Sequence, residues 1–135
     1  MMDLSAYIER IPNGGETLKG DLFTTGFGGK GANQAVMAAR CGVPVSMISG
    51  VGNDNFGLDM LKNLSENKID TNSIFRFPGT SGIAHIWVEE SGENRITIIP
   101  GANFKLEPEA VVEEMKSFKD IGYVVAQCEV PLEVV

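Results

Sequence analysis

The feature that most constrains the fold of this chain is a glycine-rich stretch that leads directly into a helix. Four of the six residues from Gly26 to Gly31 are glycines, and small apolar residues then recur at helical spacing as far as Arg40. Glycine lets the backbone approach a ligand closely, and the first N–H groups of a helix have no acceptor within it. The stretch therefore predicts a site for an anion or for hydroxyl oxygens, with Lys30 and Asn33 as polar partners. A tight turn with a solvated Lys30 is the alternative.

Two nucleotide-binding motifs match this stretch only in part. Gly26, Gly28 and Gly31 fit the dinucleotide fingerprint G-x-G-x-x-G, but the preceding Asp21–Thr25 is too polar for the buried strand that the fingerprint follows. The phosphate loop G-x-x-x-x-G-K-[ST] fails because Thr24 stands at its first glycine position and a glycine follows the lysine. A fragment of a dinucleotide-binding oxidoreductase is kept as an alternative function.

Three helices are predicted from the spacing of apolar residues and from capping signals. The first covers Gly31–Arg40, and the second covers Phe56–Asn67 with Asn53 or Asp54 as its N-cap. The third begins near Pro108, a residue that suits the first turn of a helix. Its buried side is expected to contain Val111, Val112, Met115 and Phe118.

Strands are predicted between these helices. Val45–Ser49 and Tyr123–Gln127 are apolar runs typical of strands buried in a parallel sheet. Ile83–Glu89 and Arg95–Ile99 indicate a hairpin, which could form a small separate sheet with Leu18–Thr25. Such a sheet serves as a lid or a subunit contact, because its apolar face needs a cover. The pattern as a whole predicts an α/β fold with a partly parallel sheet, flanking helices and a small β lid.

Charge and hydropathy exclude several classes of partner. The net charge is −7 and the basic residues form no cluster, so binding to nucleic acid is not expected. No apolar stretch approaches the ~20 residues of a membrane helix, and no signal peptide is recognised, so we expect a cytoplasmic protein. Cys41 and Cys128 are expected to be free, buried thiols. His85 lies in an alternating segment and is expected on a half-exposed strand, not as a catalytic base.

Several motifs, in one order along nearly the whole chain, resemble the ribokinase-like (phosphofructokinase-B type) carbohydrate kinases. The first signature of that family resembles Gly28–Ala35, which reads GGKGANQA. Further resemblances lie at Pro12–Thr17, Gly50–Gly57, Gly92–Arg95, Pro100–Asn103 and Gln127–Glu133. The resemblance implies that residues 1–135 are the N-terminal part of a ribokinase-like domain. Its lid segments would lie at about residues 5–25 and 81–100.

The resemblance also implies a sugar site between the α/β body and the lid. Asp3 and Glu129 would accept hydrogen bonds from sugar hydroxyls, and Ala84 and Ile98 would form the apolar contact of the lid with the sugar. Leaving a buried carboxylate unpaired costs about 1–3 kcal/mol, which would reject sugars without the matching hydroxyl. Asp3 as a solvated residue and Glu129 as a cap of the Pro131 turn are the alternatives. The glycine-rich turn would contribute Gly29, Lys30, Gly31 and Asn33.

In the intact family enzyme, the resemblance implies ATP-dependent phosphorylation of D-ribose to ribose 5-phosphate, with Mg and a monovalent cation, in a homodimer joined through the lids. The family's first strand, nucleotide site and catalytic aspartate have no counterpart here. We therefore expect a chain truncated at both ends, with no catalytic residue, no bound cofactor and no activity alone. The alternatives are a non-catalytic sugar-binding or dimerisation module and a fragment of a related fructokinase or nucleoside kinase.

Overall fold

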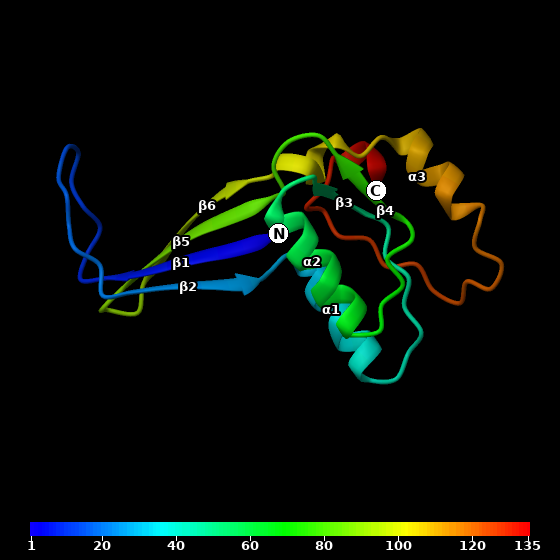
Figure 1. Ribbon diagram of the computed structural model, residues 1–135, viewed down its shortest axis with the longest axis horizontal. Coiled ribbons are helices and arrows are strands. Elements are labelled where there is room, and N and C mark those ends of the chain that lie inside the picture. Colours follow the sequence, from blue (N-terminus) through cyan, green and yellow to red (C-terminus); the bar gives the residue numbers. More distant parts are fainter.

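Four strands form a sheet that projects from one side of the molecule in the computed structural model, which describes residues 1–135 (Figure 1). The order across this sheet is β2-β1-β5-β6; β1 and β5 run parallel, and the two outer pairs are antiparallel. We call this sheet the lid. Its strands are β1 (Met2–Ile8), β2 (Leu22–Phe27), β5 (Ile83–Glu89) and β6 (Asn94–Ile99).

The other elements form the body of the molecule. Strands β3 (Ser49–Gly52) and β4 (Ile74–Phe77) pair in parallel. Asp54 is the N-cap of α2, where its side chain accepts the N–H of Gly57 at 2.8 Å. The helices and 3-10 turns of the body are α1 (Lys30–Arg40), α2 (Asn55–Glu66), η1 (Gly101–Lys105), α3 (Pro108–Met115) and η2 (Leu132–Val134).

One hydrophobic core joins the lid to the body. Met2 and Leu4 of β1 pack in the same cluster as Val51 of β3 and Met60 and Leu64 of α2. Ala32, Ala35, Val36 and Ala39 of α1 pack against this cluster from their helix. Because β1 contributes both to the lid and to the core, the base of the lid is attached to the body while its outer part projects into solvent (Figure 1).

The structure confirms the three predicted helices and the predicted hairpin. The hairpin turn contains Gly92 at φ +84°, a conformation that glycine adopts without steric cost. His85 lies on β5, as expected, and it is exposed where the sequence predicted a half-exposed residue. The lid contains one strand more than the sequence predicted, because β1 enters it between β2 and β5.

Three sequence predictions are wrong. Residues 123–127 form no strand and Tyr123 is 95% exposed, because no neighbouring strand pairs with this segment. In residues 45–49 only Ser46 forms an isolated bridge, to Asp70, and the strand begins at Ser49. The expected buried side of α3 is not buried: no residue of the helix is, and Val112 is 55% exposed.

The two cysteines, Cys41 and Cys128, are free as predicted, but both are exposed and not buried. Cys41 follows the last turn of α1, and Cys128 lies in an irregular segment. The apolar character of cysteine favours burial, but a side chain is buried only where another element packs over it, and both of these side chains are exposed.

At the tip of the lid, the carboxyl of Glu16 is expected to titrate at about pH 2. Hydrogen bonds from Arg10 and from the Asn13 N–H lower its pKa from the ordinary 4.5 to about 2. Since the folded pKa lies below the unfolded one, the contact stabilises the loop fully above about pH 4.5 and is lost as the pH falls toward 2. A carboxyl NMR titration measures this midpoint, which Arg10→Gln should raise. A midpoint near 4.5 in the unmodified chain would contradict the prediction.

Candidate functional site

The glycine-rich turn between β2 and α1 passes directly beneath Asp3 of β1. Gly28 is buried, and a Cβ added there would collide with the Asp3 carboxylate. Gly29 follows at φ +90°, a conformation that disfavours any residue with a side chain. The close approach of backbone to carboxylate therefore depends on this pair of glycines.

An ion pair closes the same turn from the other side. The Nζ of Lys30 lies 2.6 Å from Oε1 of Glu129, and the backbone N–H of Lys30 donates to Oε2 at 2.7 Å. Burial disfavours ionisation of Glu129, but both hydrogen bonds and the positive charge of Lys30 outweigh it and lower the pKa of Glu129. Glu129 is therefore an ionised acceptor that faces the first turn of α1.

Asp3 is the second carboxylate of the site. Burial raises its pKa; the ammonium of Met1 opposes that effect, and the nearby charge of Glu129 adds to it. Across the lid, Asp3 pairs with Ala84, and Ala84 pairs with Ile98. Cross-strand partners share one face of a sheet, so Asp3, Ala84 and Ile98 form a row on one face of the lid.

The remaining predicted residues lie on α1. Gly31 directly follows Lys30 and is half-buried against the side chain of Gln127. Asn33 has an exposed side chain with no hydrogen bond to the rest of the chain, while its backbone N–H donates to the Gly29 carbonyl. The structure thus gathers Asp3, Gly29, Lys30, Gly31 and Glu129 at the junction of lid and body. The Asn33 side chain forms no hydrogen bond to them, and Ile98 is linked to Asp3 only through its strand neighbour Ala84.

Comparison with known proteins identifies the family. Residues 1–134 match the model of the pfkB family carbohydrate kinases. The chain belongs to the pfkB family. A deoxyribokinase of Salmonella typhimurium is 42% identical to it over 136 residues, covering all of this chain and 44% of that protein. A ribokinase of Lactococcus lactis is 43% identical over 98% of this chain and 44% of its own length.

Solved structures of pfkB-family kinases share the fold. Ribokinase from Thermotoga maritima is 32% identical, with a TM-score of 0.85, over 98% of this chain and 44% of that one. Ribokinase from Arabidopsis thaliana, complexed with ribose and ATP, is 28% identical with a TM-score of 0.83 over the same shares. The chain thus spans less than half the length of these relatives. These likenesses confirm the predicted α/β class with its partly parallel arrangement and β lid.

The family fold also explains why the dinucleotide fingerprint misleads. In that fingerprint the glycines follow a strand of a parallel βαβ unit. Here Gly26 lies in β2, an antiparallel edge strand of the lid, and α1 leads to β3 in a different sheet. The oxidoreductase alternative therefore has no support in the fold.

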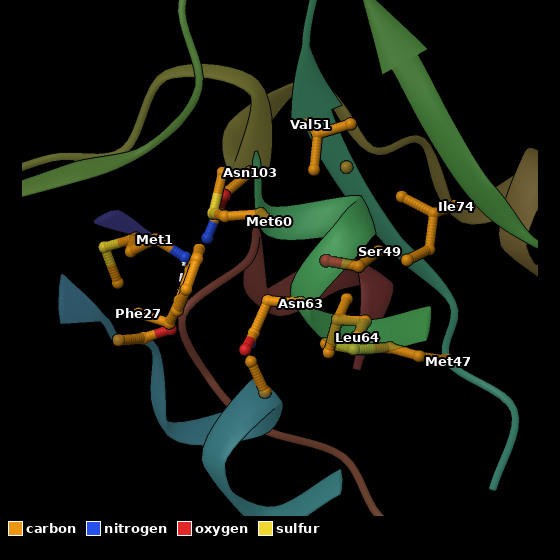
Figure 2. A pocket seen from close by; sticks show the side chains of 13 residues that line it. Met1, Phe27, Met47, Ser49, Val51, Met60, Asn63, Leu64, Ile74 and Asn103 are labelled. Carbon is orange, nitrogen blue, oxygen red and sulfur yellow. Dashed lines mark hydrogen bonds between the residues drawn. The ribbon is translucent and has the colours of Figure 1, made fainter. Parts of the chain in front are cut away.

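Sequence reasoning overlooked Asn103 in this pfkB-family site. Its side-chain Nδ2 donates to the backbone carbonyl of Glu129 at 3.3 Å. Figure 2 shows Asn103 beside Met1, Phe27 and Met60 at one end of a cavity of about 40 Å³. Ligand pockets usually measure ~300–1,000 Å³, so this cavity is too small for a sugar and belongs to the packing beneath the site. Asn103 ends the family-like motif Pro100–Asn103, and that motif could have identified it as a candidate residue of the site.

Side chains of His, Cys, Asp and Glu do not gather in groups of three or more that could hold a metal. None of the helices has the length and apolar character needed to cross a membrane.

Proposed function

We propose that this chain supplies the sugar site and β lid of a ribokinase-type carbohydrate kinase, with D-ribose as the sugar. One observation carries the proposal: Asp3 from the lid, the Gly28–Gly29 turn and the Lys30–Glu129 pair converge at the junction of lid and body. In this assignment residues 1–135 are the N-terminal part of the kinase domain. The lid then consists of the strands within residues 2–27 and 83–99.

The chemistry of the junction suits a polyhydroxylated ligand. Each sugar hydroxyl can donate one hydrogen bond and accept others, so it needs acceptors and donors placed a few ångströms apart. The Glu129 and Asp3 carboxylates are the acceptors, and the Lys30 ammonium and the Asn33 amide are the donors. A sugar that lacks one matching hydroxyl would leave a carboxylate unpaired, at a cost of about 1–3 kcal/mol.

The lid would supply the apolar half of the site. Ala84 is buried and Ile98 is 51% exposed, and both share the face of Asp3. A furanose ring has C–H groups on its faces, which pack favourably against such side chains while its hydroxyls face the carboxylates. Ile98 would contact the sugar only if the lid lay over the glycine-rich turn. Closure over a bound substrate is the usual motion of a lid.

The intact kinase would use ATP as phosphoryl donor, with Mg and a monovalent cation. The residues present here include no cluster suited to a metal, so we assign no cofactor to them. Their part is to hold the sugar and orient its hydroxyl toward the phosphoryl donor. There are two alternatives: a fragment of a related fructokinase or nucleoside kinase, and a sugar-binding module without catalysis.

Isothermal titration of this chain with D-ribose, 2-deoxyribose, fructose and adenosine tests the proposal. We expect saturable binding of ribose, with fructose and adenosine at least about tenfold weaker because their substituents change the hydroxyl pattern. Tighter binding of fructose, adenosine or 2-deoxyribose would reassign the substrate. Absence of binding to all four by a folded chain would refute the sugar site.

We also propose that two copies of the chain pair through their lids. The face that carries Asp3 is apolar further out: Tyr7 is 39% exposed and Leu22, its partner on β2, is 56% exposed. On β6, Ile96 is 54% exposed on the same face. A projecting sheet with an uncovered apolar face is suited to pack on its own counterpart.

Replacing Ile96 with aspartate should dissociate this dimer. A symmetric contact buries the side chain twice, at about 1.5–3 kcal/mol each, so we expect dimerisation to weaken by about a hundredfold or more. Sedimentation velocity over a concentration series measures the change. Thr97→Asp, on the opposite face of the same strand, is the matched control and should leave the dimer intact. A wild-type chain that stays monomeric at high concentration would contradict the proposal.

A further inference from the structure

We propose that Asp54 and Ser81 are positioning residues that set the angle of the lid over the sugar site. This inference rests on the proposed sugar site and assigns a role to two residues that do not belong to it. We call the hydrogen bonds between the Asp54 carboxylate and Ser81 the lid anchor.

The lid anchor is a dense group of hydrogen bonds at the root of β5. Ser81 is 0% exposed, and its hydroxyl donates to Oδ1 of Asp54 at 2.6 Å while its backbone N–H donates to Oδ2 at 2.8 Å. The hydroxyl oxygen of Ser81 also accepts the N–H of Gly52, at 2.9 Å. The Asp54 carboxylate therefore accepts hydrogen bonds from both the side chain and the backbone of Ser81, just before β5 of the lid begins.

The same carboxylate fixes the body. Oδ1 of Asp54 caps α2 through the N–H of Gly57, so the lid root and the start of α2 share one acceptor group. Burial alone would raise the pKa of Asp54, but the hydrogen bonds from Ser81 and Gly57 lower it, and the group is ionised. Hydrogen bonds to an ionised acceptor are about twice as strong as neutral ones, so this joint is stiff.

Apolar packing at the lid root is incomplete on this side. A hollow of about 280 Å³ lies beside the lid anchor, lined by Phe56 from the body and by Ile83 and Ile99 from the lid. Ile83 and Ile99 are cross-strand partners next to the Ala84–Ile98 pair, so they occupy the opposite face of the lid. Since Ile83 and Phe56 also pack against the hydrophobic core, the core and the lid anchor attach the lid root together, and the hydrogen bonds supply the directional part of that attachment.

The lid anchor is close enough to the sugar-facing row to control it. Ser81 precedes Ala84 by three residues, which is roughly 10 Å of extended chain. Ala84 lies between Asp3 and Ile98 in the row across the lid. A change in direction at Ser81 therefore tilts the apolar contact and the Asp3 strand together.

Ser81→Ala and Asp54→Asn test the inference, with Ser73→Ala as the matched control. Ser73 is also buried, and its hydroxyl also donates to a carboxylate at 2.6 Å, that of Glu114, within the body. Asp54→Asn keeps a good N-cap for α2 but places an NH₂ group against a Ser81 donor. With Oδ1 kept as the cap, the Ser81 hydroxyl keeps its acceptor, but the Ser81 N–H loses its acceptor at Oδ2. The variant therefore weakens the lid anchor without uncapping the helix, and it remains informative if Ser81→Ala does not fold.

Hydrogen exchange of the full chain is the first measurement. Both variants should speed exchange of the β5 and β6 amides by about tenfold or more and leave the α2 amides near wild type, while Ser73→Ala should leave the lid unchanged. Lid exchange at the wild-type rate in both variants, or an equal acceleration in the control, would overturn the inference.

Ribose affinity is the second measurement. If the wild-type chain binds ribose, both lid-anchor variants should bind it about tenfold more weakly, and Ser73→Ala should bind it normally. Faster amide exchange in the lid together with an unchanged ribose affinity would show that Asp54 and Ser81 are not positioning residues for the sugar site. If the wild-type chain binds no sugar, the proposed function fails. In that case, wild-type exchange rates in the lids of both lid-anchor variants would also refute a role of the lid anchor in attaching the lid. Faster exchange in both would support that role.

Discussion

Gly52→Ala is expected to destabilise the chain by about 3 kcal/mol, the upper end of the usual cost of overpacking. Gly52 is buried at the end of β3, and a Cβ there would collide with backbone atoms of Gly79, Thr80 and Ser81. Backbone atoms at the lid root cannot rotate aside as the end of a side chain can, so the clash must be relieved by moving the lid or the strand. Urea unfolding followed by circular dichroism measures the loss of stability.

Gly26→Ala is the matched control for this prediction. Gly26 also lies in a strand, its φ is not positive, and a Cβ there has no neighbour within 4 Å. Alanine should therefore be neutral or stabilise by about 0.4–1 kcal/mol, because it restricts the unfolded chain. Equal losses of stability in the two variants would show that backbone crowding at the lid root is not the cause.

Glu129→Gln is expected to weaken ribose binding by about ten- to a hundredfold. A hydrogen bond to a charged group contributes about 1.5–3 kcal/mol, and the amide would also lose the attraction of the Lys30 ammonium. The loss of stability should be smaller, about 1 kcal/mol, because the Lys30 side chain is 67% exposed and solvent screens the pair, although the Glu129 side chain is only 17% exposed. Calorimetric titration and urea unfolding of the same preparation separate the two effects.

Glu133→Gln removes the same charge four residues later, from an exposed side chain in η2. It should leave ribose affinity unchanged. If it weakens binding as much as Glu129→Gln does, the effect comes from the net charge of the segment. If Glu129→Gln binds ribose like the wild type, Glu129 is a structural partner of Lys30 and not a ligand of the sugar.

The two carboxylates of the site were predicted from the family resemblance alone. Glu129 and Asp3 were expected only from motifs that resemble the family, since neither lies in a pattern that spacing alone can interpret. The contact of Glu129 with Lys30 joins residues 99 positions apart. No local pattern encodes such a pair, because its geometry depends on how two distant segments pack.

The wrong prediction for residues 123–127 has a related cause: a local pattern cannot show whether a distant segment will pack beside it. Its apolar residues are those of a strand, but a strand exists only where a neighbour pairs with its backbone, and here Val125 is 75% exposed. The helices were predicted correctly because their hydrogen bonds connect residues four apart, and their caps lie next to them.

The amino-acid sequence by itself determined the helices, the lid hairpin, the glycine-rich turn into α1 and, through its motifs, the family. These features depend on neighbouring residues, so they can be recognised locally. The tertiary structure alone decided that β1 enters the lid, that Gly28 lies against Asp3, that Asn103 supports Glu129 and that Asp54 holds Ser81. Each of these joins residues at least 15 positions apart (Tyr7 of β1 to its partner Leu22 of β2 is the shortest separation), and only packing around a shared core brings such segments together.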